Sequence, residues 1–273
     1  MSISFSRALR RTGVVCLVVV ALLATALGSR AASGSNAIAS TGTRTARTAV
    51  VSGTTRGGEA RGFYSSKPLT LRAGGQALTA FPPSKTASAR PMTVVYLHGA
   101  HGRADNGCPW FRAGTSELGW LVCPEAIEEQ PDGSWSWGAD VFEQSPVVAR
   151  ALRAAVANGS SPEPGVAVGF SQGSYVALDL VKARLAKFRG LVLLGAELHP
   201  NARTLRDAGV QRVALGAGSL DGAHASLVEE AQRLAAEGLE ARFFDLGRVG
   251  HTYAAEDTTA LHDAITWAGG LTN

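Results

Sequence analysis

The segment from residue 165 to residue 185 places a sharp turn between a strand and a helix, and this order constrains the fold more than any other feature of the chain. An apolar run, Val166-Ala167-Val168, enters the pentapeptide Gly169-Phe170-Ser171-Gln172-Gly173, and a helix-like run, Tyr175 to Leu185, follows it. A turn this tight needs small residues on both sides, since a side chain there would collide with the neighbouring strand or helix. The pattern is typical of a nucleophile elbow, which holds a serine hydroxyl out at the end of a strand.

Apolar and β-branched runs alternate with longer amphipathic stretches over the rest of the chain, as in a mainly parallel sheet covered by helices. Strands are expected over residues 69–72, 77–81, 93–97, 120–123, 165–170, 191–194, 212–215 and 242–246. Helices are expected over residues 147–157, 175–185, 227–235 and 256–267. We therefore predict one α/β domain over residues 62–273, with a doubly wound sheet flanked by helices. The connections are short, so no large cap domain is expected.

The N-terminus has the composition of an export signal. Arg7, Arg10 and Arg11 precede an apolar stretch from Val14 to Leu27, and small residues follow. Residues 1–32 are therefore predicted to be a signal peptide, which implies a secreted, periplasmic or cell-envelope location. The apolar stretch is shorter than the about 20 residues that a membrane-spanning helix needs, so an uncleaved anchor is the weaker alternative. We expect no stable membrane insertion once the signal is removed.

Residues 33–61 are rich in Ser, Thr, Gly and Ala and are predicted to form a disordered linker, because such a segment buries too little apolar surface to offset its ordering entropy. Residues 1–61 carry eight arginines and one acidic residue, whereas the remainder carries 18 basic and 21 acidic residues. The excess of positive charge that gives the chain its pI of 9.2 thus lies in residues 1–61. The predicted domain shows no basic stripe interleaved with aromatic residues, and we expect no nucleic-acid partner.

Two cysteines, Cys108 and Cys123, remain beyond the predicted signal peptide. An even number of cysteines in an exported chain favours a disulfide, with two buried free thiols as the alternative. Closing this loop would stabilise the fold by about 3 kcal/mol in the chain-entropy model. A metal site needs more ligands than two cysteines offer, and we expect neither a metal nor a cofactor.

Two further segments supply groups that a serine nucleophile needs. A serine hydroxyl is a poor nucleophile at neutral pH, so it requires a histidine base and a carboxylate that holds the imidazole. His251 follows the last predicted strand through a glycine-containing loop, and Asp221 follows the strand before it. We predict a catalytic triad of Ser171, Asp221 and His251. Glu197 also follows a predicted strand, so it is kept as the alternative acid.

The segment His98-Gly99-Ala100-His101-Gly102 follows the predicted strand over residues 93–97. Glycines at this place let backbone amides approach a substrate carbonyl. We assign the oxyanion hole to the backbone amides of Ala100 and Gln172.

Four aromatic or imidazole side chains near these segments have two interpretations each. Trp135 and Trp137 either form an apolar subsite or pack their loop onto the core. His101 and His199 either line the site or are simply exposed.

Together these segments resemble an α/β-hydrolase, closest in pattern to the phospholipase/carboxylesterase and dienelactone-hydrolase-like groups that include acyl-protein thioesterases. The matching segments are His98-Gly99, Gly169 to Gly173, the Asp221 loop and Gly250-His251. The resemblance spans about residues 91–268. Ser174 departs from it, because acyl-protein thioesterases usually have glycine there, and dienelactone hydrolases use cysteine in place of Ser171.

The resemblance and the triad pattern predict an exported serine hydrolase that cleaves a carboxylic ester or thioester through an acyl-enzyme intermediate. The expected partner is a small-molecule or polymer-linked ester, because nothing in the sequence resembles a long lid. A serine peptidase or amidase of the same fold is one alternative. A catalytically silent binding module is another, although every triad member is present in the sequence.

Overall fold

The computed structural model describes residues 67–84, 87 and 90–271. The predicted signal peptide, the predicted linker and residues 62–66 of the predicted domain lie outside the described residues. The strands are β1 Leu69–Ala73, β2 Gln76–Phe81, β3 Met92–Leu97, β4 Gly119–Cys123, β5 Glu128–Glu129, β6 Trp135–Ser136, β7 Gly165–Phe170, β8 Phe188–Leu194, β9 Arg212–Ala217 and β10 Glu240–Asp245. The helices are α1 Ala104–Thr115, α2 Val141–Ala157, α3 Gln172–Lys182, α4 Ala202–Asp207, α5 His224–Ala236 and α6 Thr259–Ala268.

Eight strands form one sheet in the order β1-β2-β4-β3-β7-β8-β9-β10, and β5 pairs with β6 in a separate hairpin. Strand β2 is antiparallel to both of its neighbours, whereas every pair from β4 to β10 is parallel. The chain runs from β3 outward to β4 and then returns across the sheet to β7. The order therefore reverses between β3 and β7, and ligands bind in doubly wound sheets at such a point, beyond the carboxyl ends of the strands.

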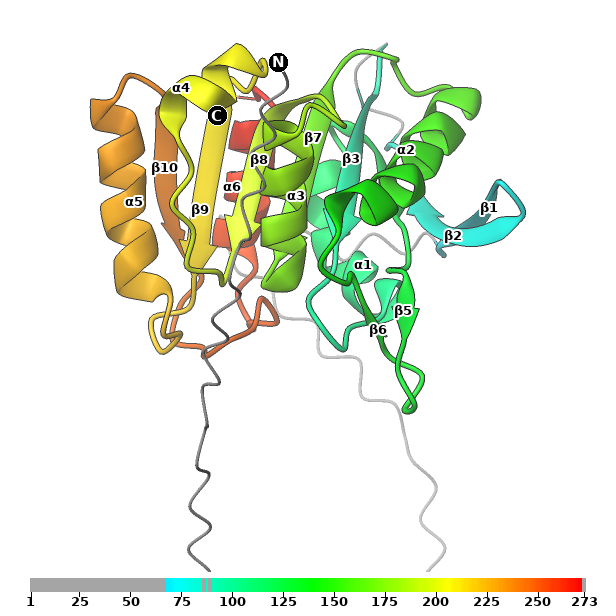
Figure 1. Cartoon of the computed structure of the whole chain (residues 1–273), viewed down its shortest axis with the longest axis horizontal. Helices are drawn as coiled ribbons and strands as arrows, with labels where there is room; N and C mark the ends of the chain where they lie inside the picture. Colours follow the sequence, from blue (N-terminus) through cyan, green and yellow to red (C-terminus); the bar gives the residue numbers. More distant parts are fainter. Residues whose placement is uncertain (1–66, 85–86, 88–89, 272–273) are drawn as a thin grey trace, which may run out of the picture. The chain divides into compact units, whose positions relative to one another are not determined.

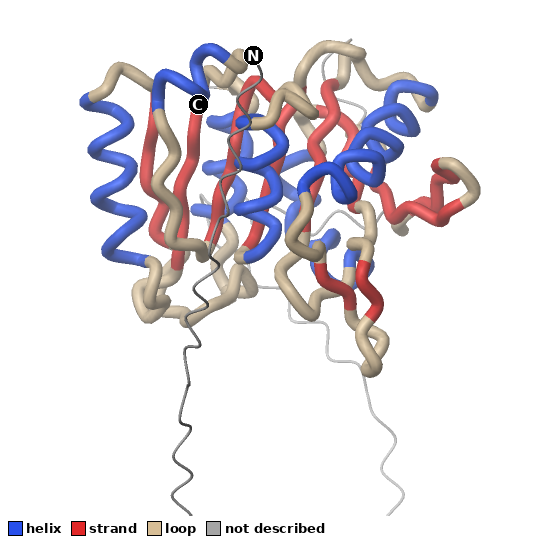
Figure 2. The backbone as a smooth tube through the Cα atoms, in the orientation of Figure 1, coloured by secondary structure: helices blue, strands red, loops and turns tan. Residues whose placement is uncertain are grey.

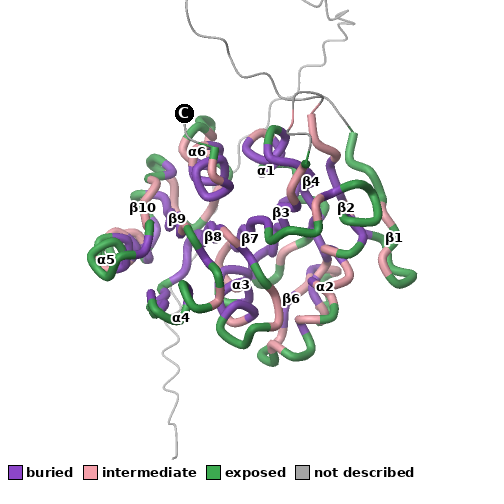
Figure 3. Tube along the Cα trace, turned by 90° about the horizontal axis from the view of Figure 1, so that it is seen from above, coloured by how far each residue is buried: buried purple, intermediate pink, exposed green. Residues whose placement is uncertain are grey.

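Helices cover both faces of the sheet, as Figures 1 and 2 show: α2, α3 and α5 lie on one face and α1 and α6 on the other. The central strands β3, β7 and β8 are buried along almost their whole length (Figure 3). Their apolar runs are those expected of parallel strands that helices cover on both sides. In the described part of the chain, no helix is both long and apolar enough to cross a membrane.

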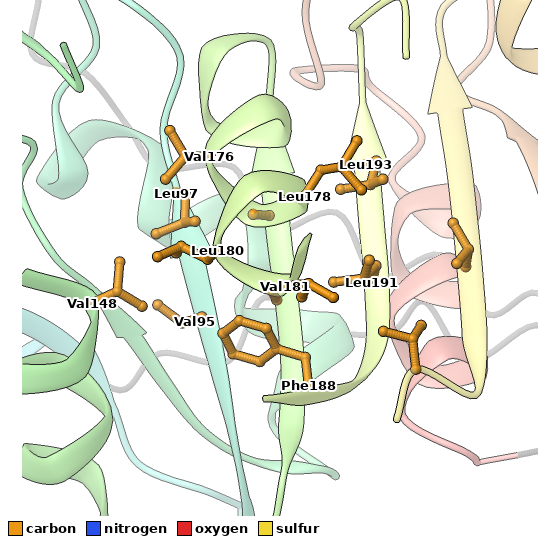
Figure 4. Close-up of a cluster of buried hydrophobic side chains, with 14 of the residues drawn as sticks. Val95, Leu97, Val148, Val176, Leu178, Leu180, Val181, Phe188, Leu191 and Leu193 are labelled. Atoms are coloured by element: carbon orange, nitrogen blue, oxygen red, sulfur yellow. The ribbon is translucent and has the colours of Figure 1, made fainter. Parts of the chain in front are cut away.

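The core beneath α3 holds the turn that follows β7 in place. Leu180 and Val181 of α3 pack near Val95 of β3 and Leu191 of β8, and Phe188 closes the lower end of this cluster (Figure 4). All five side chains are at most 1% exposed. Helix and sheet are thus packed rigidly on both sides of the elbow, which limits how far the turn between them can move.

Helix α2 begins at Val141, six residues before the predicted start at residue 147. Asp140 accepts a hydrogen bond from the backbone N–H of Phe142 at 2.8 Å and so caps the first turn. Pro146 lies within the helix, directly before the predicted start, although proline usually interrupts a helix.

A disulfide joins Cys108 on α1 to Cys123 at the end of β4, which confirms the predicted pairing. The two Cα atoms lie 6.0 Å apart, within the usual range for a disulfide. Both cysteines are fully buried. The bond therefore ties α1 to the sheet from inside the core.

Replacing both cysteines with alanine is expected to lower the free energy of unfolding by about 2–5 kcal/mol. The cause is the larger conformational freedom of the unfolded chain once the bond between residues 108 and 123 is removed. Urea unfolding of the variant and of the wild-type protein under non-reducing conditions measures the difference. Unfolding of the wild-type protein in the presence of dithiothreitol is the control, and equal stability of all three samples would contradict the prediction.

Candidate active site

Ser171 occupies the turn between β7 and α3 and has φ 51° and ψ −118°. A positive φ is uncommon for a residue with a side chain and costs on the order of 1–3 kcal/mol. The backbone N–H of Ser171 donates to the carbonyl of Leu194 at 2.8 Å, so the end of β8 holds the turn. The strained conformation thus points the serine side chain away from the core, as the elbow pattern predicts.

The two glycines of the pentapeptide are needed because other backbone passes close to them. A Cβ at position 169 would collide with the backbone of Gly173 and Ser174. A Cβ at position 173 would collide with the carbonyl of Leu97 in β3. Larger residues would therefore push α3 away from the sheet and displace Ser171.

Ser174 stands where acyl-protein thioesterases usually have glycine, and its side chain links α3 to β8. Its buried hydroxyl donates to the carbonyl of Leu194 at 3.0 Å and accepts from the N–H of the same residue at 3.0 Å. Ser174 and Ser171 therefore bond the same strand end, which joins the first turn of α3 to β8.

The three predicted triad residues lie in mutual contact. His251 lies in the loop between β10 and α6, and its Nε2 is 3.0 Å from Oγ of Ser171. The other ring nitrogen, Nδ1, is 2.9 Å from Oδ2 of Asp221. The Asp221 side chain is 5% exposed, and its Oδ1 accepts the N–H of Ala223 at 3.0 Å. The carboxylate is thus fixed by two contacts, which suits a group that orients an imidazole.

The structure brings Asp221, rather than Glu197, to His251. Glu197 is exposed, and its backbone carbonyl accepts the hydroxyl of Tyr175 at 2.9 Å. Gly195, directly after β8, has φ 58°, a backbone conformation that glycine adopts readily. A Cβ at position 195 would lie 3.2 Å from Oδ2 of Asp221 and 3.3 Å from the His251 ring. The absence of a side chain at Gly195 therefore leaves space for Asp221 and His251, which lie in the loops after β9 and β10.

The backbone amides of Ala100 and Gln172 have no hydrogen-bond acceptor among the described residues. Gln172 is the first residue of α3, where an N–H has no partner within the helix and the positive end of the helix dipole favours negative charge. A Cβ at Gly99 would lie 3.3 Å from Cβ of Ser171, so this loop passes directly beside the serine. Both amides are therefore available to an oxyanion, as the predicted assignment requires.

His98 anchors the loop that carries Ala100. The imidazole is buried, with Nδ1 2.8 Å from the carbonyl of Gly99 and Nε2 2.8 Å from Oε1 of Glu125. The indole N–H of Trp137 donates to the backbone carbonyl of His98 at 2.9 Å. These contacts of His98 fix the loop, and none of them uses the backbone N–H of Ala100.

Trp135 and Trp137 pack their loop onto the core and do not form an apolar subsite. Trp137 is completely buried. The backbone of Trp135 exchanges hydrogen bonds with Gly102 at 3.1 and 2.8 Å. Among the predicted imidazole candidates, His101 lines the site, whereas the His199 side chain is 78% exposed and lies 3.6 Å from Glu230.

A cavity of about 450 Å³ lies beside Ser171. Its aromatic lining comes from Tyr96, Trp110, Phe170 and Tyr253. The rest of the lining is mainly polar and includes His101, Arg103, Asn106, Asp132, Ser134 and Thr252. Two of the aromatic residues have a sequence signal, since Phe170 directly precedes the predicted nucleophile and Tyr253 follows the predicted base by two residues.

Two charged residues that line the cavity, Arg103 and Asp132, each have a hydrogen-bonded partner. Arg103 contacts Asp105 at 3.0 Å, and this hydrogen bond lowers the pKa of the Asp105 carboxyl. The hydroxyl of Ser134 donates to Asp132 at 2.5 Å and lowers the pKa of that carboxyl in the same way. Both carboxyls are thus ionised at neutral pH, so the mouth of the cavity is polar while its wall is aromatic.

No family model and no curated relative matches the sequence, but many solved structures resemble the fold. An uncharacterized protein from Bacillus cereus ATCC 10987 has a TM-score of 0.56 and 17% identity over 67% of this chain and 60% of that chain. Esterase PE8 has a TM-score of 0.54 and 19% identity over 73% of this chain and 100% of that chain. FphF, a fluorophosphonate-binding serine hydrolase of Staphylococcus aureus, has a TM-score of 0.53 and 17% identity over 75% of this chain and 97% of that chain.

The chain spans 60% of the length of the first of these proteins and nearly all of the other two. At such identities the likeness shows the fold. The mostly parallel sheet, the helices on both of its faces and these structural neighbours together define an α/β-hydrolase fold, which confirms the predicted fold class.

Proposed function

We propose that this protein is an exported serine hydrolase that cleaves a carboxylic ester or thioester through an acyl-enzyme intermediate. The observation that carries the proposal is the line of contacts from Ser171 through His251 to Asp221, at 3.0 and 2.9 Å. These distances fit a nucleophile, a general base and a carboxylate that orients the base. The esterase and serine hydrolase neighbours of the fold support the same reaction class.

In the first half of the proposed reaction, His251 Nε2 takes the proton of the Ser171 hydroxyl while Oγ attacks the carbonyl carbon of the substrate. The carbonyl oxygen becomes an oxyanion and accepts hydrogen bonds from the amides of Ala100 and Gln172. Each such donor contributes about 2.7–4 kcal/mol to stabilising the transition state. Collapse of the tetrahedral intermediate breaks the ester bond, and His251 gives its proton to the departing alcohol or thiol.

In the second half, water replaces the alcohol. His251 takes a proton from the water, whose oxygen attacks the acyl carbon, and the same oxyanion donors act again. Collapse of this second intermediate releases the carboxylic acid and returns the proton to Ser171 Oγ. Asp221 keeps Nδ1 protonated throughout and stabilises the imidazolium that forms in each half.

The export part of the proposal depends on the N-terminal sequence and on the disulfide. Residues 1–32 have the composition of a signal peptide. The buried bond between Cys108 and Cys123 supports an oxidising destination, because such bonds persist mainly outside the cytoplasm. The polar, open mouth of the cavity is in keeping with a soluble or polymer-linked ester as the substrate.

A fluorophosphonate probe is expected to label the intact protein at Ser171, because this class of reagent traps a serine that a neighbouring base activates. Mass spectrometry of the tryptic peptides locates the adduct, and a series of aryl esters with increasing acyl length measures turnover. Heat-denatured protein is the control and should remain unlabelled. The proposed function is wrong if the native protein gives neither an adduct at Ser171 nor turnover of any ester.

A further inference from the structure

The wall of the cavity beside Ser171 is a connected set of aromatic rings that begins at the proposed base. The Phe170 ring lies 5.0 Å from the His251 ring and 4.8 Å from the Tyr253 ring, which it meets at 90°. Tyr253 in turn lies 6.5 Å from Trp110, which is 36% exposed. Rings arranged in this way offer both faces and edges to a further ring, and aromatic pairs prefer such edge-to-face and offset contacts.

The same wall contains the hydroxyl group of Tyr253, which accepts one hydrogen bond and can still donate another. Tyr96 Oη donates to Tyr253 Oη at 3.0 Å. Tyr96 is 1% exposed, whereas Tyr253 is half-buried and is the outer member of the pair. The hydroxyl hydrogen of Tyr253 has no acceptor in the part of the chain that the structure describes. This hydrogen is therefore available to a group that enters the cavity.

Gly107 of α1 lets the two hydroxyls lie directly against the helix backbone. A Cβ at this position would lie 2.5 Å from Tyr96 Oη and 2.7 Å from Tyr253 Oη. The neighbouring Cys108 is fixed to β4 by the disulfide, so this part of α1 is held at the cavity wall. The two hydroxyls thus contact the backbone of α1, with no side chain between the helix and the hydroxyls.

Both tyrosines act as neutral donors at neutral pH. Burial raises the pKa of Tyr96 well above its usual 10.0, and the contact with Tyr253 adds to this effect. Burial also raises the pKa of Tyr253. A saturated alkyl chain in the cavity would remove water from the Tyr253 donor and give it no acceptor, which is unfavourable.

We propose that this cavity binds an aromatic ring of the ester substrate and that the Tyr253 hydroxyl donates a hydrogen bond to a polar substituent on that ring, such as a phenolic hydroxyl. This inference rests on the proposed serine hydrolase function and specifies its substrate class. Tyr253 is then a residue that determines specificity, and Phe170 and Trp110 provide the faces against which the ring packs. A ring without the substituent binds less well, because the Tyr253 donor is left unpaired.

The test uses matched esters in which two methylene groups separate the ring from the ester, so that the substituent does not alter intrinsic reactivity. Ethyl 3-(4-hydroxyphenyl)propanoate and ethyl 3-phenylpropanoate place the ring on the acyl side. 4-Hydroxyphenethyl acetate and phenethyl acetate place it on the alcohol side. In one of these pairs the hydroxyl is expected to raise kcat/KM by about 3- to 10-fold, as one net hydrogen bond predicts. The cyclohexyl analogue of that pair is expected to be the poorest substrate.

Two variants separate donation to the substrate from the hydrogen bond between the tyrosines. Tyr253→Phe removes the proposed donor and is expected to bring the ratio of kcat/KM within the pair to about 1. Tyr96→Phe removes the same hydrogen bond between the tyrosines but keeps the Tyr253 hydroxyl, so the preference should remain. Tyr175→Phe is the matched control, because the Tyr175 hydroxyl bonds to Glu197 outside the cavity. Circular dichroism verifies that each variant is folded.

The proposal is overturned if the wild-type protein shows no hydroxyl preference in either pair, if the cyclohexyl ester is cleaved as well as the phenyl ester, or if Tyr253→Phe keeps the preference. The wild-type ratios decide the matter even if Tyr253→Phe does not fold. Fluorophosphonate labelling distinguishes a failure of the aromatic subsite from a failure of the hydrolase function. Labelled wild-type protein without the hydroxyl preference contradicts the aromatic subsite alone, whereas protein with neither labelling nor turnover contradicts the hydrolase function.

Discussion

Replacing Ser171 with alanine is expected to lower kcat for ester hydrolysis by about 10⁶-fold, the loss typical of removing the nucleophile from a serine triad. The imidazole of His251 would then have no hydroxyl at 3.0 Å to deprotonate. A residual rate about 10³–10⁴-fold above that of water would remain, because substrate binding and the oxyanion donors are still present. Steady-state kinetics on the best ester substrate measures the effect, and fluorophosphonate labelling at this position should disappear.

Ser219→Ala is the matched control for this variant. Ser219 is exposed and lies two residues before Asp221, so its hydroxyl is close to the triad in sequence without being part of it. The kcat of the Ser219→Ala variant should stay within a small factor of the wild-type value. If Ser171→Ala retained a large share of the activity, the nucleophile would have to be another group, and the proposed acyl-enzyme would be excluded.

Asp221→Asn is expected to lower kcat by about 10⁴-fold while leaving the fold intact. The carboxylate accepts a hydrogen bond from His251 Nδ1 at 2.9 Å, whereas an asparagine amide can donate to that nitrogen instead. The proton of the neutral imidazole would then lie on Nε2, which could no longer accept the proton of Ser171. Kinetics on the same ester and thermal unfolding of the same preparation separate the loss of activity from any loss of stability.

Glu197→Gln provides the comparison, because it makes the same change of acid to amide at the alternative candidate. Glu197 is exposed, and its backbone, rather than its side chain, makes the contact with Tyr175. Near wild-type activity is therefore expected. The opposite result, with an active Asp221→Asn protein and an inactive Glu197→Gln protein, would transfer the role of the acid to the loop after β8.

The elbow and its partners were predictable because each is encoded by a few neighbouring residues. Strand patterns end directly before Ser171, and glycine marks the turns around this residue and before His251. The choice between Asp221 and Glu197 was open in the sequence, since both follow strands. The structure places Asp221 2.9 Å from His251 and leaves Glu197 exposed. This difference depends on how each loop folds after its strand, and a backbone angle such as the positive φ of Gly195 cannot be read from a single glycine.

Helix α1 was not predicted, because Gly107, Pro109 and Gly114 within it all disfavour a helix. The structure explains two of these residues by close contacts. Gly107 lies against the tyrosine hydroxyls of the cavity, and a Cβ at Gly114 would lie 3.1 Å from the backbone of His262 in α6. Tertiary packing and the disulfide of Cys108 therefore stabilise a helix that its local sequence does not favour.

The sequence places Phe170 and Tyr253 near the predicted triad, but the complete cavity could not be predicted, because its aromatic wall comes from distant parts of the chain. Tyr96 lies near the end of β3, Trp110 lies on α1, Phe170 ends β7 and Tyr253 follows the proposed base by two residues. The hydroxyls of Tyr96 and Tyr253 meet across 157 positions of sequence. The order of strands in the sheet places Tyr96 and Phe170 on neighbouring strands, and helix α1 and the loop after β10 add the other two rings.

The conformation of Ser171 has a consequence for the evolution and engineering of this chain. A φ of 51° is easily adopted by glycine, whereas serine there costs on the order of 1–3 kcal/mol. That is a noticeable share of the about 5–15 kcal/mol by which a typical domain is stable. Selection for thermostability alone would therefore favour glycine at position 171. A library of variants of this protein needs selection for turnover at every round, or its most stable members will be those that have lost the proposed nucleophile.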